Sequence, residues 1–333
     1  MDYISKFVSL KEYIPFGNPD LSHFGIHEHK IDFTSDKNIL VKNEWISVDP
    51  YMRARMTERK NYKPPFELNK PMEGAAIGKV IESNSSDFSK GDIVKSELGW
   101  RDKFITSKNN LQKIKPISVP LQTYLGPLGL TGHTAYIGLF RIAELKENQT
   151  VLVSSAAGSV GSAVCQIAKI KGCKVIASTG SDEKVNWLKN EIGVDEAFNY
   201  KKVDNLVLHL KSLSPEGYDL YFDNVGGEFL ESAIFRMKNY GKIVICGRIS
   251  QMNSPNHSLK NIAHVLVKRL TIKGFLIFDH SEDKKDFERD MESWIKNKKI
   301  KWRETIIEGI ENAPQAFIDL LNGKNIGKML VKI

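Results

Sequence analysis

Cysteine is scarce in this sequence, and the few thiols form no known motif. The chain has 333 residues and only three cysteines, which are Cys165, Cys173 and Cys246. None forms a CxxC pair, and none stands near a histidine at zinc-finger spacing. This usage argues against a disulfide scaffold and favours small buried thiols in a reduced intracellular compartment.

Long hydrophobic runs are also missing. No apolar stretch approaches the ~18 residues that a membrane-spanning helix needs. The first fifteen residues mix Asp2, Lys6, Lys11 and Glu12 with apolar residues, so they lack the basic start and continuous apolar stretch of a secretion signal. We therefore expect a soluble, cytoplasmic protein with no membrane partner.

The charge is basic overall but is not concentrated in one place. The formal net charge is +8, yet the lysines are scattered, and no basic stripe interleaved with aromatic residues is present. The short cluster Lys296, Lys298, Lys299 and Lys301 is interpreted as a solvated helix face. We expect no nucleic-acid partner, although such a field would attract a phosphorylated small molecule.

The composition allows a sizeable core, and the first third of the chain is β-rich. Hydrophobic residues make up 41% of the sequence, enough for two ordinary domains. Strands are predicted at 39–48 and 74–81, and residues 90–94 form a turn that leads into a further strand. Short strands separated by turns are typical of a small barrel.

The pattern changes near Leu121, where short apolar runs begin to alternate with helix-length amphipathic segments. Strands are predicted at 150–154, 174–178, 196–200, 218–222, 242–246 and 271–277, with helices at 160–171 and 182–190. Alternation of this kind builds an α/β fold with a doubly wound parallel sheet. The closing residues, 313–333, are predicted to form one helix and one strand that return to the first domain.

The clearest motif is the glycine-containing segment Ala156-Ala157-Gly158-Ser159-Val160-Gly161. It follows the first strand of the α/β region and opens a helix, and it matches a dinucleotide fingerprint whose first glycine is replaced by Ala156. Gly158 lets the backbone approach a pyrophosphate, and Gly161 permits close packing of helix and strand. The free amides at the helix start would meet the phosphate charge.

The end of the second strand indicates which dinucleotide binds. Folds specific for NAD place an acidic residue there to bind the ribose 2′-hydroxyl, whereas this chain reads Ser178-Thr179-Gly180-Ser181. Asp182 and Glu183 follow and are expected to cap the next helix. Lys184 lies close by, so a 2′-phosphate and hence NADPH are favoured. An ordinary surface lysine is the alternative interpretation of Lys184.

Several segments resemble one family. These are Asp49-Pro50-Tyr51-Met52-Arg53, the 156–161 loop, Tyr221-Phe222-Asp223-Asn224-Val225-Gly226-Gly227, Cys246-Gly247-Arg248-Ile249-Ser250 and Asn325-Ile326-Gly327-Lys328. In this order they resemble the prostaglandin reductase / leukotriene hydroxydehydrogenase branch of the zinc-independent medium-chain dehydrogenase/reductases, which includes alkenal double-bond reductases. The resemblance covers nearly the whole chain.

The resemblance implies a two-domain fold. A GroES-like β-barrel domain is expected over 1–122 and 304–333, and a Rossmann NADPH-binding domain over 123–303, with the active site in the cleft between them. It also implies a homodimer.

The resemblance further implies which residues contact the cofactor. Gly158, Ser159, Val160 and Gly161 would meet the phosphates, and Lys184 and Tyr200 the 2′-phosphate. The ribose and nicotinamide would be lined by Asn224, Cys246, Gly247, Arg248, Ile249, Ser250, Gln251, Met252 and Asn253. The pocket would be completed by Phe275, Leu276, Ile277 and Asn325.

The ligands of a zinc site are missing from the expected places. Zinc-dependent relatives carry a cysteine near the Asp-Pro-Tyr position and a histidine in a Gly-His-Glu segment, where this chain has Val48-Asp49-Pro50-Tyr51 and Pro71-Met72-Glu73-Gly74. A nitrogen and sulfur zinc site cannot be assembled from the remainder. The histidine group His23, His27 and His29 is interpreted as surface residues. We therefore expect no metal.

Without a metal, conjugate reduction is the most accessible chemistry. Hydride would reach the β-carbon of an α,β-unsaturated aldehyde or ketone, while charge collects on the carbonyl oxygen and needs a hydrogen-bond donor. Family members often place a tyrosine where this chain has Met252, which cannot donate. Tyr51 is therefore the predicted catalytic donor, with a barrel-core aromatic as its alternative role. Arg248 adds a cation to the same loop.

Two other functions remain compatible with the sequence. An NADPH quinone reductase would share the cofactor loop and differ only in substrate. A non-catalytic NADPH-binding protein, regulatory or holding RNA on its basic surface, would explain the +8 charge and the missing tyrosine at position 252.

Overall fold

The computed structural model describes residues 2–34, 38–252 and 258–333. The chain divides into two compact units. The first comprises Met1–Leu125, Glu304–Asn325 and Met329–Ile333, and the second comprises Gly126–Arg303 and Ile326–Lys328. The domain limits expected from the sequence, 1–122 with 304–333 and 123–303, stay a prediction about how the chain is divided.

The first unit is built from β-sheets. Its described strands are β1 (Asp2–Leu10), β2 (Phe24–Asp32), β3 (Ile39–Ser47), β4 (Ala76–Ser83), β5 (Ile93–Ser96), β6 (Lys103–Thr106), β7 (Gln112–Lys113), β14 (Glu304–Glu308) and β15 (Lys328–Lys332). Strands β1 and β2 pair with each other, and the others form a sheet in the order β14-β15-β3-β4-β5-β7, with β6 beside β3. The predicted strands at 39–48 and 74–81 correspond to β3 and β4.

The hairpin of β1 and β2 was not anticipated from the sequence. The two strands pair antiparallel from Asp2 with Asp32 to Leu10 with Phe24. The connection between them lacks a short hairpin turn, because thirteen residues separate Leu10 from Phe24 and include the 3₁₀ helix η1 (Leu21–His23). The pairing is therefore a tertiary contact that no local turn signal predicts.

The core of the first unit contains residues from distant segments. Met52 and Met56 of the 3₁₀ helix η2 (Pro50–Met56) are buried with Trp100 and with Phe317 of helix α8 (Ala313–Leu321). The indole of Trp100 and the ring of Phe317 meet edge to face, with centroids 6.3 Å apart. The predicted closing helix and strand are α8 and β15, and β15 pairs with β3.

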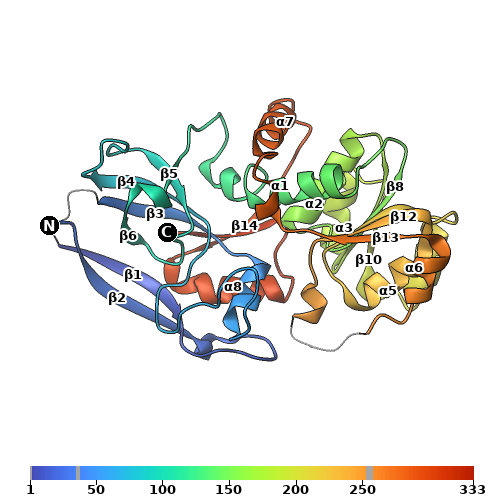
Figure 1. The fold of residues 1–333 in the computed structure, drawn as a ribbon, viewed down its shortest axis with the longest axis horizontal. Coiled ribbons are helices and arrows are strands. Elements are labelled where there is room, and N and C mark those ends of the chain that lie inside the picture. The colour runs from blue at the N-terminus through green and yellow to red at the C-terminus, as the bar shows by residue number, and fades with distance from the viewer. Residues whose placement is uncertain (1, 35–37, 253–257) are drawn as a thin grey trace. The chain divides into compact units, whose positions relative to one another are not determined.

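The second unit contains a parallel sheet (Figure 1). Its strands are β8 (Thr150–Val153), β9 (Lys174–Thr179), β10 (Glu196–Asn199), β11 (Tyr218–Asp223), β12 (Met237–Ile245) and β13 (Thr271–Gly274). Their order is β10-β9-β8-β11-β12-β13, and all neighbours run parallel. In chain order this is 3-2-1-4-5-6, the arrangement of a doubly wound dinucleotide-binding fold. The predicted fold class is confirmed here.

Helices cover the sheet in two groups. Helix α1 (Leu130–Ile137) contacts α2 (Ser159–Ile170) and α7 (Lys284–Lys296), and α5 (Gly227–Arg236) contacts α4 (Leu206–Leu213) and α6 (Ile262–Lys268). The group around α4 and α5 buries Leu210 and Ile234 together with Leu152, Tyr221 and Ile243 of the sheet. This packing positions the strand ends at which the predicted cofactor residues lie.

Some element limits differ from the sequence expectation. Strand β13 ends at Gly274 rather than continuing to residue 277, and a 3₁₀ helix, η9 (Ile277–His280), follows it. Strand β12 begins five residues before the predicted position 242. Helix α3 (Asp182–Trp187) is shorter than predicted and passes into a π-helical turn, η6 (Leu188–Ile192). Apolar periodicity thus predicts that these elements exist, but it does not predict the residues at which they begin and end.

Candidate cofactor-binding site

The loop between β8 and α2 leaves the start of the helix open. Helix α2 begins at Ser159, and its N-cap, Gly158, offers no side-chain acceptor to the first turn. Gly158 lies in extended backbone and forms a parallel bridge with Gly327. The amides of the first helical turn point out of the helix without an intrahelical partner. An anion is the natural acceptor for them.

Two glycines in this region are required by close backbone approach. A β-carbon on Gly161 would lie 2.4 Å from the carbonyl oxygen of Ser155 and 2.7 Å from the Cα of Ala156. On Gly327, whose φ is +68°, it would lie 1.9 Å from the carbonyl oxygen of Arg303. Gly158 is different, because its nearest contact would be 3.3 Å. Gly161 thus serves packing, whereas Gly158 leaves space in front of the helix.

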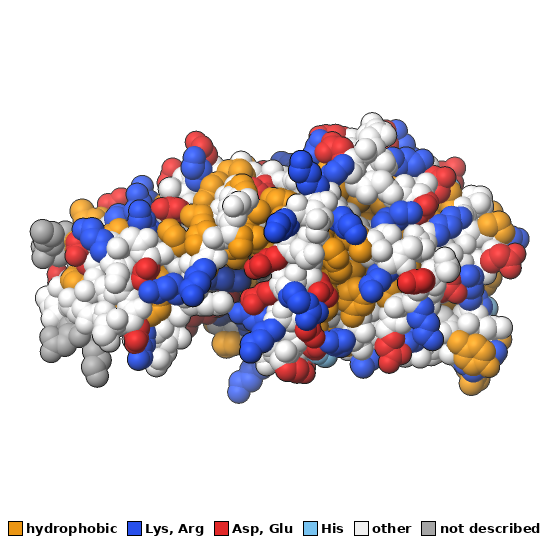
Figure 2. All heavy atoms as spheres, turned by 90° about the horizontal axis from the view of Figure 1, so that it is seen from above, with side chains coloured by type: hydrophobic (Ala, Val, Ile, Leu, Met, Phe, Trp, Pro, Cys, Tyr) orange, Lys and Arg blue, Asp and Glu red, His pale blue; other side chains and the backbone are white. Residues whose placement is uncertain are grey.

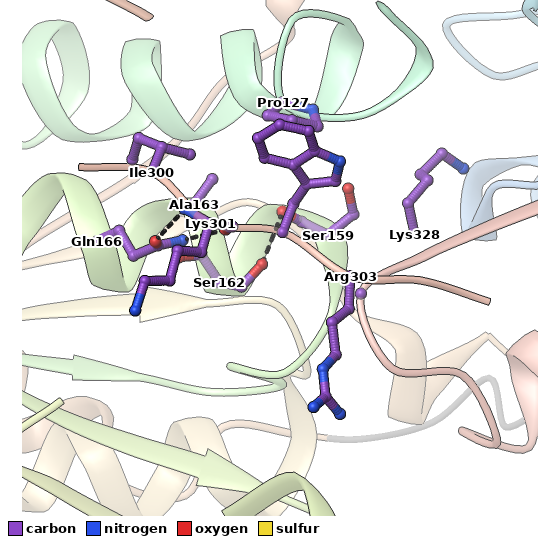
Figure 3. Close-up of a pocket in the computed structure, with 11 residues that line it drawn as sticks. Pro127, Ser159, Ser162, Ala163, Gln166, Ile300, Lys301, Arg303 and Lys328 are labelled. Atoms are coloured by element: carbon purple, nitrogen blue, oxygen red, sulfur yellow. Dashed lines mark hydrogen bonds between the residues drawn. The ribbon is translucent and has the colours of Figure 1, made fainter. Parts of the chain in front are cut away.

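A small pocket runs along one side of α2 (Figure 3). The side chains of Ser159, Ser162 and Gln166 face the segment that precedes β14. Gln166 is buried and binds Lys301 twice, donating to its carbonyl at 2.8 Å and accepting from its amide at 2.7 Å. The Ser159 hydroxyl lies 2.7 Å from that of Thr131. These contacts fix the first turns of α2 from one side.

At the tip of β9, two side chains approach a glycine. A β-carbon on Gly180 would lie 3.4 Å from Cε1 of Tyr200, 3.7 Å from its hydroxyl and 3.5 Å from Cε of Lys201. Tyr200 is 46% exposed, so its ring is available to a ligand. Burial lowers the pKa of Lys184 below its ordinary value, and the nearby ammonium of Lys201 lowers this pKa further. The structure thus places Tyr200 and Lys201 beside Gly180, and the ammonium of Lys201 near that of Lys184.

The acidic residues after β9 do not cap the helix, contrary to expectation. Ser181 is the N-cap of α3 and accepts from the amide of Lys184 at 3.4 Å. Asp182 instead accepts from Lys202 at 2.5 Å and from Asn199 at 3.0 Å. Hydrogen bonds from these two residues hold the pKa of Asp182 below its ordinary value. Asp182 therefore stays charged and is paired with Lys202.

The end of β11 is organised by a buried carboxylate. Oδ1 of Asp223 accepts from the Tyr221 hydroxyl at 2.6 Å and from the amides of Val225 and Gly226 at 2.9 and 2.8 Å. Its other oxygen is buried without a hydrogen bond among the described residues. Burial raises the pKa of Asp223, while the hydrogen bonds it accepts oppose that rise. The carboxylate fixes the turn that begins at Asn224.

Asn224 and the loop after β12 are tied to the same strand end. Asn224 donates its side-chain amide to the Ser154 carbonyl at 2.8 Å. The amides of Cys246 and Gly247 donate to the Asp223 carbonyl at 2.9 and 3.0 Å, and Ser250 donates its hydroxyl to the Val225 carbonyl at 2.7 Å.

The rest of this loop follows the same turn. A β-carbon on Gly226 would lie 2.8 Å from Oε1 of Gln251 and 3.3 Å from Cβ of Arg248. Ile249 begins the 3₁₀ helix η8 (Ile249–Gln251), which Met252 ends. The structure therefore brings Asn224 and 246–252 together at the carboxyl ends of β11 and β12. Asn253 lies outside the described residues.

The remaining cofactor candidates are the three residues after β13, whose last residue, Gly274, pairs with Ile245 of β12, and Asn325. The ring of Phe275 would lie 3.2 Å from a β-carbon on Gly138, beside Phe222. Leu276 is 38% exposed, and Ile277 begins η9. Asn325 is buried and belongs to the first unit. The predicted roles of all these residues stay predictions.

Tyr51, the predicted catalytic donor, lies in η2 of the first unit and is partly buried against its core. Its hydroxyl makes no hydrogen bond with any described residue. Burial raises the pKa of Tyr51 well above 10, and the Asp49 carboxylate adds to this rise. The ammonium of Lys63 lies 5.0 Å from the ring centroid. Tyr51 is thus a neutral donor whose hydrogen is not used within its own unit.

The thiols are not arranged as metal ligands. All three cysteines belong to the second unit, and burial raises the pKa of Cys246 to about 12. Zinc binds the thiolate form. Among the described residues, one group of possible ligands, His280, Glu282 and Asp283, has its ligand atoms within 4.8 Å of one another. Asp283 is already paired with Arg141 at 2.6 Å.

The surface carries both signs of charge. On the face drawn in Figure 2, Lys and Arg side chains lie among Asp and Glu side chains. Within the part of the chain that the structure describes, no helix is long and apolar enough to cross a membrane.

Sequence reasoning missed three of the residues that organise this region. Lys201 was not predicted, although it is next to Tyr200 in the run Tyr200-Lys201-Lys202 that directly follows β10. The role of Asp223 was not predicted, because the motif does not show that its carboxylate is buried. Its donors Tyr221, Val225 and Gly226 are near in the sequence, and Ser154 donates from the end of β8 at 3.3 Å. Gln166 lies on an apolar helix face, where a polar residue is an available signal of a buried partner.

Comparisons with known proteins place the chain in a family. A model described as the N-terminal domain of oxidoreductase matches residues 6–114, and one described as zinc-binding dehydrogenase matches residues 159–297. Bovine (Bos taurus) prostaglandin reductase 1 is 42% identical over 322 residues, 95% of each chain. The NADP⁺-dependent 2-alkenal reductase of Nicotiana tabacum is 40% identical over 335 residues, 99% of this chain and 97% of the relative.

A solved structure agrees with these relatives. CurA from Vibrio vulnificus, crystallised in complex with NADPH, superposes with a TM-score of 0.92 at 35% identity and covers 98% of both chains. The architecture is therefore that of a GroES-like domain with a Rossmann domain. The chain belongs to the medium-chain dehydrogenase/reductase family, in the zinc-independent branch that includes prostaglandin reductase and 2-alkenal reductase.

Proposed function

We propose that the protein reduces the carbon–carbon double bond of small α,β-unsaturated aldehydes and ketones with NADPH. The enzyme is an NADP-dependent oxidoreductase acting on CH–CH groups. The observation that carries the choice of substrate is the 40% identity, over 99% of this chain, to a 2-alkenal reductase.

The residues of the second unit fit the proposed cofactor. The uncapped start of α2 and the space in front of Gly158 suit a pyrophosphate, because helical amides and the helix dipole favour negative charge. The tip of β9 carries no carboxylate to bind a ribose 2′-hydroxyl. It instead carries Lys184 and the Tyr200 hydroxyl, which suit a 2′-phosphate. Asn224 and the 246–252 loop follow the carboxyl ends of β11 and β12. The strand order reverses between β8 and β11, and doubly wound folds bind their ligands at this edge of the sheet.

The chemistry needs one donor near the substrate oxygen. When bound, NADPH supplies a hydride for the β-carbon. The negative charge then moves to the carbonyl oxygen, and a hydrogen-bond donor there lowers the barrier. Tyr51 is proposed for this role, because its hydroxyl is neutral and uncommitted in its own unit. Met252 has no hydrogen to donate. Solvent can protonate the α-carbon afterwards.

A substrate screen tests this proposal. Purified protein is supplied with NADPH and, in turn, 2-alkenals, enones and quinones, and the products are identified by mass spectrometry. Saturated aldehydes and ketones with retained carbonyl groups are the expected products. Turnover of quinones alone, or reduction of the carbonyl group to an alcohol, would contradict the proposed reaction.

We further propose that the protein is a homodimer formed through the second unit. Strand β13 ends the described parallel sheet and pairs only with β12, so its other edge is open to another strand. The preceding helix, α6, exposes Ile262, Leu266 and Val267 at 56%, 80% and 64%. A patch of adjacent exposed apolar side chains beside an open strand edge favours association with a second copy.

A further inference from the structure

We propose that Lys201 is a second phosphate-binding cation of the cofactor site and, with Lys184, determines the preference for NADPH over NADH. This inference rests on the proposed function, since it assigns a residue to the proposed 2′-phosphate position. The observation behind it is the convergence of Lys201 and Tyr200 on Gly180 at the tip of β9.

The geometry places Lys201 on the same side of Gly180 as the Tyr200 hydroxyl. Cε of Lys201 and the Tyr200 hydroxyl would lie 3.5 and 3.7 Å from one point, a β-carbon on Gly180. Gly180 has no side chain to fill that space. A phosphate above Gly180 would therefore be within reach of the hydroxyl and of the flexible lysine end.

The ammonium of Lys201 makes no hydrogen bond or ion pair with any described residue. The backbone amide of Lys201 donates to the side chain of Asn199 at 3.1 Å. The adjacent Lys202 differs, because it is paired with Asp182 at 2.5 Å. Asn199 also donates its side-chain amide to Asp182. The carboxylate of Asp182 is thus used by Lys202, and no described carboxylate pairs with Lys201.

The two neighbouring ammonium groups, of Lys184 and Lys201, favour binding of an anion that carries more than one negative charge. The ammonium of Lys201 is near enough to Lys184 to lower the pKa of Lys184. Like charges placed together cost free energy, and a bound dianion removes that cost. A phosphate monoester carries ≈ −1.5 to −2 at neutral pH and offers three acceptor oxygens. Two lysines and one hydroxyl match this set.

The test compares two nucleotides that differ in one phosphate. Adenosine 2′,5′-bisphosphate and adenosine 5′-monophosphate are titrated calorimetrically into wild-type protein, Lys201→Ala and Lys202→Ala. We expect Lys201→Ala to lower the affinity for the bisphosphate about fivefold and the affinity for the monophosphate less than twofold. Lys202→Ala, the matched control of equal charge change, should leave both affinities within about twofold. Lys201→Arg should restore bisphosphate binding.

The outcomes separate this inference from the proposed function. Wild-type protein that prefers the bisphosphate, combined with an unchanged Lys201→Ala, would overturn the role of Lys201 and leave NADPH as the cofactor. Wild-type protein with no preference would overturn both. Equal losses in Lys201→Ala and Lys202→Ala would mean that general surface charge, rather than a directed contact, attracts the nucleotide, and this also contradicts the proposal. The same variants assayed for the NADPH to NADH ratio of kcat/KM should rank in the same order.

Discussion

The hydroxyl of Tyr221 donates a 2.6 Å hydrogen bond to Oδ1 of Asp223, and both side chains are fully buried. The same hydroxyl lies 3.0 Å from Oγ of Ser154, which accepts from the amide of Asn224. This pair therefore links the ends of β8 and β11 on either side of the point where the strand order reverses. The loops proposed to hold the cofactor depend on it.

Removing the carboxylate of Asp223 should lower the stability of the fold. Asp223→Ala leaves the Tyr221 hydroxyl and the amides of Val225 and Gly226 without their acceptor, and we expect a loss of about 3 kcal/mol in the free energy of unfolding. Tyr221→Phe removes one hydroxyl and should cost about 1 kcal/mol. Urea unfolding measures both values. Equal costs for the two variants would show that Asp223 does not organise the turn.

The buried carboxyl should also affect how stability varies with pH. Because burial raises the pKa of Asp223 above 3.8, the folded state holds its proton at pH values where the unfolded state has lost it. The contribution of Asp223 to stability therefore falls as pH rises from 3.8 through its folded-state pKa. We expect the free energy of unfolding of the wild type relative to Asp223→Asn to decrease over that range. A difference that rises with pH would contradict the direction of the shift.

Two glycines of the cofactor loop should respond differently to alanine. Gly161→Ala forces a β-carbon against the backbone at Ser155 and Ala156, so we expect a loss of about 2–3 kcal/mol in unfolding free energy. Gly158→Ala meets its nearest atom at 3.3 Å with extended backbone, and its stability cost should stay below about 1 kcal/mol. Gly158→Ala should nevertheless lower the affinity for NADPH about tenfold, as measured by fluorescence titration. Unchanged NADPH binding in Gly158→Ala would argue against the pyrophosphate position.

The proposed donor can be tested by removing one oxygen atom. Tyr51→Phe should lower kcat for an enone about 100-fold, with little change in stability, because its hydroxyl bonds to no described residue. Tyr13→Phe is the matched control. The Tyr13 hydroxyl donates to the Phe66 carbonyl at 2.9 Å, so its loss should affect stability and not kcat. Because the pKa of Tyr51 lies well above 10, Tyr51 does not titrate below pH 9. The pH profile of kcat below pH 9 should therefore have the same shape in the wild type and in Tyr51→Phe.

The proposed dimer predicts a defined effect of charge on α6. Leu266 is 80% exposed, and Leu266→Glu should convert the dimer to a monomer, because burying a carboxylate in an apolar interface is costly. Leu208→Glu, at a position 62% exposed on α4, is the control and should leave the dimer intact. Light scattering during size-exclusion chromatography gives the mass. A wild-type monomer, or dissociation in both variants, would contradict the proposed interface.

Local pattern sufficed for much of the second unit. The alternation of apolar runs and helix-length segments placed β8 to β11 and α2 within a residue or two of their observed positions, because these elements are bounded by turns and buried on regular faces. The pattern misplaced the end of β13, where Phe275 and Leu276 continue an apolar run outside the sheet. Strand ends depend on which partner is available, and the pairing of β13 with β12 ends at Gly274, opposite Ile245.

The sequence alone determined the glycine-containing loop after β8 and the absence of a carboxylate at the tip of β9, because both follow from residue types at fixed local spacing. Only the tertiary structure decided that Tyr200 and Lys201 lie beside Gly180, that the Ser154 hydroxyl reaches Asp223 from the end of β8, and that β15 pairs with β3. The physical reason is separation along the chain. The relative positions of residues that are close in the sequence are set by local backbone geometry, whereas contacts between distant segments depend on how the sheets and helices pack.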